Sequence, residues 1–173
     1  MDRVWLLTWT TYGQWLPGDR RGFVGDTRTV DWEKIIHNAP GTSYDSDLPA
    51  LAAYSRRIMK GEPILLQTAQ APLLLEQFQE TARYRGWQLL AVAIMANHIH
   101  VVVGVPGDPE PSFLLQSFKE YGSRKLNRTY GKPSNGAWWT ESGSKRKLPD
   151  DAAVAAVVAY VEQQAFPLLI WPA

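Results

Sequence analysis

The stretch that decides the fold is Gln88–Val103, which reads QLLAVAIMANHIHVVV. Two runs of aliphatic residues flank the short connection Ala96-Asn97, a pattern that predicts a β-hairpin. Successive side chains of a strand point to opposite faces, so His98 and His100 share one face of the returning strand. The branched apolar residues on the other face would be buried against a core. The sequence therefore predicts two imidazoles presented together.

Two imidazoles at positions i and i+2 of a strand lie close enough to bind one metal ion. The alternative is that both are ordinary polar residues of a half-exposed strand, and a short motif alone does not decide between the two. The chain has no cysteine. Disulfides and thiolate metal sites are therefore excluded, and nitrogen or oxygen atoms would have to hold any metal.

Length and composition are typical of one globular domain. The chain has 173 residues, of which 45% are apolar and 20% charged. The absence of cysteine favours a cytoplasmic protein. The opening MDRVWLLTWTTYG is too short and too polar for a signal peptide or a membrane span, so we expect a soluble chain.

The charge is unevenly distributed. The net charge is +1, but Lys119–Lys147 holds eight cations and two carboxylates, so this segment carries +6 and the remainder −5. A basic segment of this kind is a plausible footprint for a polyanion. A solvated helix and loop that happen to be basic would look the same on charge alone.

The elements around the hairpin indicate an α+β fold. Hydrophobic spacing and stop signals predict a strand at Val4–Thr10, helices at Pro72–Arg85, Ser112–Asn127 and Asp150–Gln164, a basic aromatic loop around Trp138–Lys147, and a possible edge strand in Phe166–Trp171. Residues 20–61 show no clean period and read as an insertion with a short helix near Leu51–Met59. This order predicts a ferredoxin-like antiparallel sheet with helices packed on one face.

The last predicted helix carries a tyrosine and an amide on one face. Tyr160 and Gln164 are four residues apart, hence one turn from each other. At the edge of the apolar face of this helix they could reach the strand that bears the histidines. The alternative is a tyrosine at the edge of the core whose hydroxyl binds water.

The sequence resembles a known family, the single-tyrosine transposases of the His-hydrophobe-His nuclease superfamily. The resemblance covers about residues 86–164 and the first strand. It rests on Met95-x-Asn97-His98-Ile99-His100, on Leu126-Asn127, on Trp138-Trp139, on Tyr160-Val161-x-x-Gln164 and on the opening Thr10–Asp19, TTYGQWLPGD. Members act on insertion sequences and, in the REP-associated branch, on bacterial palindromic repeats. The 20–61 segment has no counterpart in the compact members.

The resemblance implies the IS200-like transposase fold, a single catalytic domain over 1–173, and a role for each motif. Tyr160 would be the nucleophile, and His98, His100 and Gln164 would hold Mg²⁺ or Mn²⁺. The tyrosine would form a 5′-phosphotyrosine link to single-stranded or hairpin DNA and leave a free 3′-hydroxyl. The protein would work as a homodimer, in which the final helix of one copy can serve the site of the other.

Basic and aromatic residues of the second half are the expected DNA contacts. They are Lys119, Arg124, Lys125, Arg128, Trp138, Trp139, Lys145, Arg146 and Lys147. Packing of the two tryptophans onto the sheet, and a solvated basic helix face, explain the same residues equally well.

Three other interpretations remain open. Tyr121 is a rival nucleophile because it lies among cations, although it shares a helical stripe with Leu114 and Phe118. A non-catalytic single-stranded nucleic-acid-binding module is the second, because ferredoxin-like sheets with aromatic residues also bind RNA. An acid–base enzyme that uses one of the histidines is the third, but no carboxylate partner is placed for it in the sequence.

Overall fold

The computed structural model describes residues 1–16, 27–28, 34–35 and 49–172. The Pro17-Gly18-Asp19 end of the opening motif and most of the expected insertion lie outside these residues. The chain divides into two compact units, one of residues 1–12 and 64–173 and the other of residues 13–63. The second unit contains β2 (Thr27–Arg28), β3 (Lys34–Ile35) and α1 (Pro49–Arg57). The first unit contains every other element.

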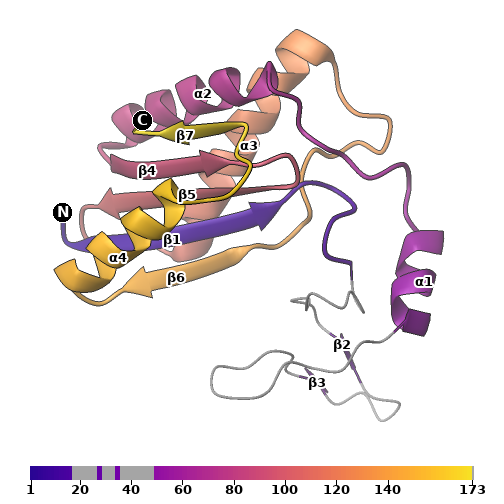
Figure 1. The fold of residues 1–173 in the computed structure, drawn as a ribbon, viewed down its shortest axis with the longest axis horizontal. Coiled ribbons are helices and arrows are strands. Elements are labelled where there is room, and N and C mark those ends of the chain that lie inside the picture. Colours follow the sequence, from indigo (N-terminus) through magenta and orange to yellow (C-terminus); the bar gives the residue numbers. More distant parts are fainter. Residues whose placement is uncertain (17–26, 29–33, 36–48, 173) are drawn as a thin grey trace. The chain divides into compact units, whose positions relative to one another are not determined.

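A five-stranded antiparallel sheet forms the centre of the first unit. Its strands are β1 (Arg3–Thr10), β4 (Gln88–Ile94), β5 (His98–Val105), β6 (Ser144–Leu148) and β7 (Leu169–Trp171). They lie in the order β6-β1-β5-β4-β7 (Figure 1). The predicted hairpin is β4–β5, and its β5 strand pairs with β1 from Arg3 opposite Val105 to Thr10 opposite His98. The structure confirms the predicted antiparallel α+β class.

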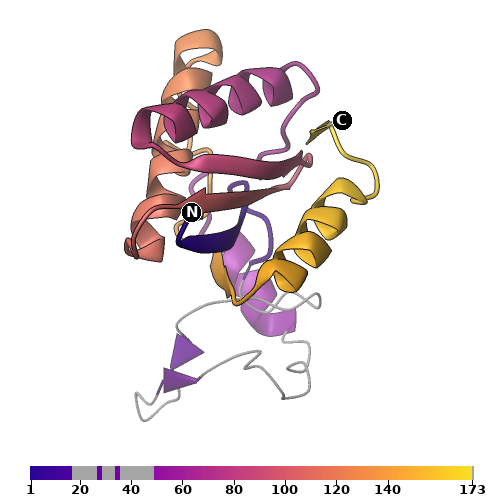
Figure 2. The ribbon, with the colours of Figure 1, turned by 90° about the vertical axis from the view of Figure 1, so that its left-hand side faces the viewer.

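Helices cover both faces of this sheet, which differs from the prediction of helices on one face. Figure 2 shows α2 (Gln70–Arg85) and α3 (Pro111–Tyr130) on one side and α4 (Asp151–Glu162) on the other. The reason is that β4 and β5 are apolar on both faces. Ala91, Ala93 and Val102 point away from α2 and α3, and they are buried by α4 through Val157 and Val161.

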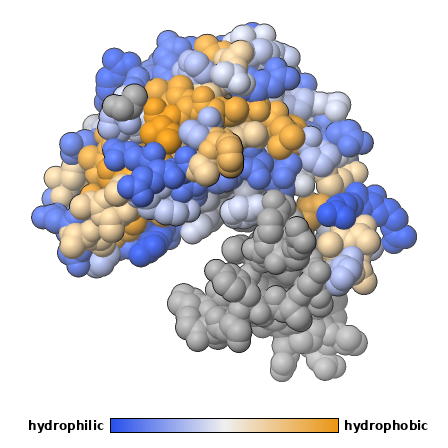
Figure 3. Space-filling model, in the orientation of Figure 1, coloured by the Kyte–Doolittle hydropathy of each residue, from blue (hydrophilic) through white to orange (hydrophobic). Residues whose placement is uncertain are grey.

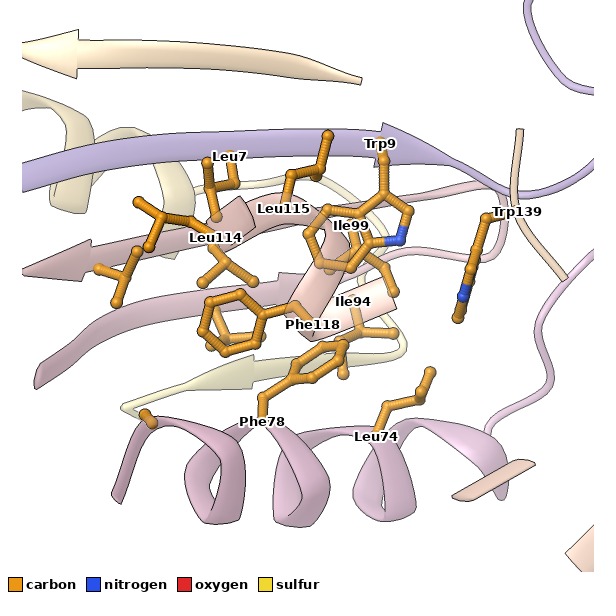
Figure 4. Packing of buried hydrophobic residues seen from close by; sticks show 14 of the residues in the cluster. Leu7, Trp9, Leu74, Phe78, Ile94, Ile99, Leu114, Leu115, Phe118 and Trp139 are labelled. Atoms are coloured by element: carbon orange, nitrogen blue, oxygen red, sulfur yellow. The ribbon is translucent and has the colours of Figure 1, made fainter. Parts of the chain in front are cut away.

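The larger core lies between the sheet and the α2–α3 layer (Figure 4). Phe78 lies at its centre, with ring centroids 5.7 Å from Trp9 and 5.5 Å from Phe118. The two helices approach closely at Gly122, where an added Cβ would come within 3.2 Å of the Leu74 side chain. This packing fixes β1 and β5 from the side of α2 and α3. The candidate functional site lies on the opposite face of these strands.

Local end signals set the helix boundaries. Gly86, with φ of 67°, ends α2 in the left-handed conformation that glycine adopts without strain. The Asp150 carboxylate begins α4 by accepting a hydrogen bond of 2.8 Å from the Ala153 amide. No helix in the described parts of the chain is long and apolar enough to cross a membrane.

Strand β6 is the element of the first unit that sequence periodicity missed. Residues 144–147 were expected in a loop, but they form an edge strand with β1. The segment reads SKRKL, and only Leu148 is buried. An edge strand whose two faces are both exposed to solvent shows no alternation of apolar and polar residues. The hydrogen bonds to β1, rather than a pattern in its own sequence, therefore define this segment as a strand.

Candidate active site

The β1–β5 register places both histidines on the face that α4 covers. His98 lies opposite Thr10, and His100 lies opposite Thr8. The two imidazole centroids are 4.8 Å apart. The alternation expected from the sequence therefore brings the two rings together, with Ile99 between them buried in the opposite core.

His100 is buried and has one satisfied ring nitrogen. Its side chain is 5% exposed, and Nδ1 lies 2.8 Å from the Thr8 hydroxyl oxygen. Nε2 is buried and makes no hydrogen bond. Burial, and to a lesser extent the neighbouring His98, lowers the pKa of His100 from 6.5 to about 4. The imidazole is therefore neutral near pH 7, the form that binds metals.

His98 is held through its own turn. Its Nδ1 lies 2.7 Å from the Asn97 side-chain oxygen. The turn itself is closed by a 2.9 Å hydrogen bond from the Met95 amide to the His98 carbonyl. Asn97 thus contacts the ring directly, in addition to shaping the turn between the strands.

Tyr160 approaches the histidines within a single chain. Its ring centroid lies 5.6 Å from that of His100, with an angle of 74° between the planes. Val157 and Val161 anchor α4 on the sheet and so position the tyrosine at the edge of the covered face. Its side chain remains 51% exposed, which leaves it accessible to a substrate in solvent.

Gln164 lies just beyond the helix that was expected to carry it. The helix α4 ends at Glu162, two residues earlier than predicted. The Gln164 side chain turns back, and its Nε2 donates a 3.0 Å hydrogen bond to the Tyr160 carbonyl. This contact uses the amide nitrogen, so the oxygen is the atom of this side chain that suits a hard cation.

The residues of this site fit a divalent cation. The buried Nε2 of His100 has no protein partner, and the His98 ring is beside it. Over the described ranges no group of three histidines, cysteines or carboxylates is arranged to hold a metal. An ion at the imidazole pair would therefore need an amide, water or substrate oxygen as its further ligands.

Tyr121, the rival nucleophile, lies elsewhere. It is half-buried on α3 and lines a cavity of about 610 Å³ with residues of α2, among them Gln77 and Tyr84. The Arg124 guanidinium lies 5.3 Å from its ring centroid. Because α3 packs on the opposite face of the sheet, the structure does not bring Tyr121 to the imidazoles.

The three cations of β6 do not share a face. Arg146 pairs with Leu6, whose side chain is on the imidazole face, so Arg146 lies on that face too. Lys145 and Lys147 point to the face of α2 and α3. The Lys147 nitrogen lies 5.8 Å from the Trp5 ring centroid. All three side chains are exposed.

Trp138 and Trp139 are buried, as the packing alternative supposed, and Lys119 is buried too, although neither alternative expected that. The Lys119 ammonium donates to the carbonyls of residues 140, 141 and 142 at 2.6, 2.7 and 3.2 Å. Burial is the main reason that its pKa is lowered to about 8. The indoles of Trp138 and Trp139 donate to the Asn127 side chain and the Lys119 carbonyl. These three residues hold the loop that leads to β6.

The cations of α3 lie behind the sheet. Arg124 forms an ion pair with Glu120, and Lys125 forms one of 2.8 Å with Glu76. Arg128 is exposed near the end of the helix. A nucleic acid that touched both this helix and the imidazoles would have to pass around the edge of the sheet.

Sequence reasoning missed Thr8 as a site residue. The segment VWLLTWT shows that Thr8 and Thr10 share a face of the first strand. Which residue of the hairpin each threonine meets depends on the register between segments about ninety positions apart in the chain. No local pattern records that register.

The family comparison decides the identity. Residues 52–164 match the model of the family described as "Transposase IS200 like". The chain belongs to the IS200-like transposase family. The match includes the imidazole pair, Tyr160 and Gln164. No curated protein matches the chain.

Two solved structures resemble this IS200-like transposase. One is a REP-associated tyrosine transposase bound to a REP hairpin, with 13% identity and a TM-score of 0.51 over 92% of this chain. The alignment spans 64% of that protein's length. The other, a candidate transposase from Deinococcus radiodurans, has 15% identity and a TM-score of 0.48, over 96% of this chain and 94% of its own. The first likeness supports the fold.

Proposed function

We propose that this IS200-like transposase cuts and rejoins single strands of DNA through Tyr160, with a divalent cation at the imidazole pair. The observation that carries the proposal is the approach of the half-exposed Tyr160 ring to within 5.6 Å of His100 in one chain. A binding module without catalysis would not need these side chains to converge. The proposed ion ligands are His98, His100 and Gln164.

The proposed reaction exchanges one phosphate ester for another. The Tyr160 hydroxyl oxygen attacks the phosphorus of a phosphodiester, and the bond from phosphorus to the 3′-oxygen breaks. The phenol proton passes to solvent, and the departing 3′-oxygen takes a proton from water. The product is a 5′-phosphotyrosine and a free 3′-hydroxyl. Because an ester bond is retained, attack by a 3′-hydroxyl rejoins the strand without ATP.

The imidazole pair supplies the place for the cation. Bound Mg²⁺ or Mn²⁺ would withdraw charge from the non-bridging oxygens of the phosphodiester, an effect of several kcal/mol on the transition state. The protein holds His100 neutral by burial, so that one of its ring nitrogens keeps a lone pair near pH 7. The α4 anchor then keeps Tyr160 beside this ring.

Single-stranded or hairpin DNA is the proposed substrate. The similar REP-associated protein was solved with a REP hairpin. Arg146 is the cation of β6 on the imidazole face, so we assign it to the phosphates nearest Tyr160. The exposed Lys145, Lys147 and Arg128 would contact DNA farther from the reaction. A homodimer remains part of the proposal, although Tyr160 reaches His100 without a second copy.

The test is a covalent adduct. The protein is incubated with Mn²⁺ and a pool of hairpin oligonucleotides with randomised single-stranded flanks, labelled at the 3′ end, and run on a denaturing gel. We expect a labelled protein band, because the 5′-phosphotyrosine keeps the downstream fragment. A 5′ label should leave with the fragment that ends in the 3′-hydroxyl.

Tyr160→Phe should abolish the adduct, and Tyr121→Phe, which removes the same atom behind the sheet, should leave it unchanged. Omission of metal, or His98→Ala with His100→Ala, should abolish cleavage and keep much of the DNA affinity. An adduct that survives in Tyr160→Phe and disappears in Tyr121→Phe would reverse the assignment. Binding without any adduct would favour the non-catalytic module.

A further inference from the structure

Thr8 makes a polar contact that the proposed reaction does not explain. Its hydroxyl oxygen lies 2.8 Å from Nδ1 of His100, across the β1–β5 pairing. The contact is partly buried, and the next threonine on the same face, Thr10, instead contacts the Thr140 hydroxyl at 2.9 Å. Of the two threonines on this face of β1, Thr8 is therefore the one whose hydroxyl contacts an imidazole.

The contact bears on which nitrogen of His100 holds the hydrogen. A neutral imidazole has one N–H group and one lone pair, on different ring nitrogens. With the hydrogen on Nε2, a buried N–H group would lack an acceptor, because Nε2 has no hydrogen-bond partner. With the hydrogen on Nδ1, that group donates to Thr8. The lone pair on Nε2 is then the atom that a cation can bind.

His98 is also held at its Nδ1 by a polar side chain. Its Nδ1 lies 2.7 Å from the Asn97 side-chain oxygen, and a carboxamide oxygen accepts hydrogen bonds only. The hydrogen of neutral His98 therefore belongs on Nδ1 and its lone pair on Nε2. Two neighbouring rings, 4.8 Å apart, are each gripped at Nδ1 by a polar side chain.

The geometry points to Thr8 as the positioning residue that fixes the Nδ1–H tautomer of His100, so that Nε2 offers its lone pair to a divalent cation. Asn97 does the same for His98. Histidines that bind metals generally donate their other N–H group to such a partner, which fixes both tautomer and ring orientation. This inference rests on the proposed metal site, but it concerns atoms of the metal-free protein.

The first experiment measures the tautomer directly. In metal-free, ¹⁵N-labelled protein near pH 7, long-range ¹H–¹⁵N correlation spectra distinguish a protonated ring nitrogen from a bare one. We expect His100 to be protonated on Nδ1 in the wild type and to populate the Nε2–H form in Thr8→Val. A wild-type His100 protonated on Nε2 overturns the inference without any variant.

The second experiment measures Mn²⁺ affinity by electron paramagnetic resonance of the free ion. We expect Thr8→Val to weaken binding about tenfold or more, the usual effect of removing such a partner. Thr8→Ser keeps the hydroxyl and should restore near wild-type affinity. Thr10→Val makes the same change on the same face and should leave affinity unchanged. Equal affinities in Thr8→Val and the wild type overturn the inference.

The two proposals fail in different ways. If the tautomer and Mn²⁺ affinity follow Thr8 but no Tyr160 adduct forms, the positioning role stands and the transposition chemistry falls. If the adduct forms but neither the tautomer nor the Mn²⁺ affinity changes in the Thr8 variants, the transposition chemistry stands and the positioning role falls. Should Thr8→Val not fold, the wild-type tautomer and Thr8→Ser still decide: a serine variant with lost Mn²⁺ affinity or an altered tautomer counts against the inference.

Discussion

His100 shows how one buried side chain serves two purposes. Its ring is covered by α4 and the neighbouring strands, and this burial lowers its pKa to about 4. The same burial keeps the ring neutral and leaves its Nε2 without a partner. The burial that makes the His100 ring suitable for a metal ion therefore also disfavours its protonation in the folded protein.

This makes the metal-free protein sensitive to acid. The unfolded chain takes up a proton on residue 100 near pH 6.5, whereas the folded chain does so only near pH 4. The unfolded state binds more protons in between, so the free energy of unfolding falls as pH drops from about 6.5 to 4. His100 should account for about 3 kcal/mol of this loss.

The measurement is urea unfolding in EDTA at pH 7.0, 5.5 and 4.5, for the wild type and His100→Gln. We expect the difference in unfolding free energy between the two proteins to shrink toward low pH, because the variant has no imidazole to protonate. A difference that stays constant across this range would show that residue 100 is not a neutral buried histidine.

At the scale of elements, strand β6 divides the basic residues 145–147 between the two faces of the sheet. Alternation along the strand puts Arg146 on the imidazole face and Lys145 on the opposite face. A charge count treats these two neighbouring cations as equivalent, but in the strand their side chains lie on opposite faces of the sheet. The helix α3 adds its cations behind the sheet, where Lys125 is paired with Glu76.

Neighbouring substitutions on β6 should therefore differ. Arg146→Ala should weaken binding of the hairpin pool several-fold and reduce the slope of log affinity against log salt by about one, since it loses a phosphate contact near the site. Lys145→Ala removes the same charge from the other face and should change both much less. Fluorescence anisotropy over a salt series without metal measures this, and equal losses in the two variants would contradict the assignment.

At the scale of the molecule, the two faces of the sheet differ in how much apolar packing covers them. The α2–α3 side has a large aromatic core around Phe78, whereas α4 contributes only two buried residues, Val157 and Val161. Figure 3 shows apolar residues, in orange, still visible around β7 on the α4 face. Part of that face is thus left uncovered.

We expect α4 to open more easily than the sheet. Few buried apolar contacts mean a low free energy of local opening, so amide hydrogens of α4 should exchange well before those of β1 and β5. Hydrogen exchange followed by mass spectrometry measures the difference on the metal-free protein. Protection in α4 equal to that of β5 would show that the helix that carries Tyr160 is as fixed as the central strands.

The sequence by itself determined the elements whose signals are local. The hairpin, the shared face of His98 and His100, and the stop of α2 at Gly86 follow from alternation, turn residues and capping, which act within a few positions. The family resemblance added the roles proposed for Tyr160 and Gln164, and the match of residues 52–164 confirmed the family.

Only the tertiary structure decided what depends on distant pairings. The second face covered by α4, the strand β6, the burial of Lys119 and the contact of Thr8 with His100 join segments far apart in the chain. Such contacts are chosen by competition for buried apolar area and hydrogen-bond partners across the whole fold. No window of neighbouring residues contains that competition, so no local pattern predicts its result.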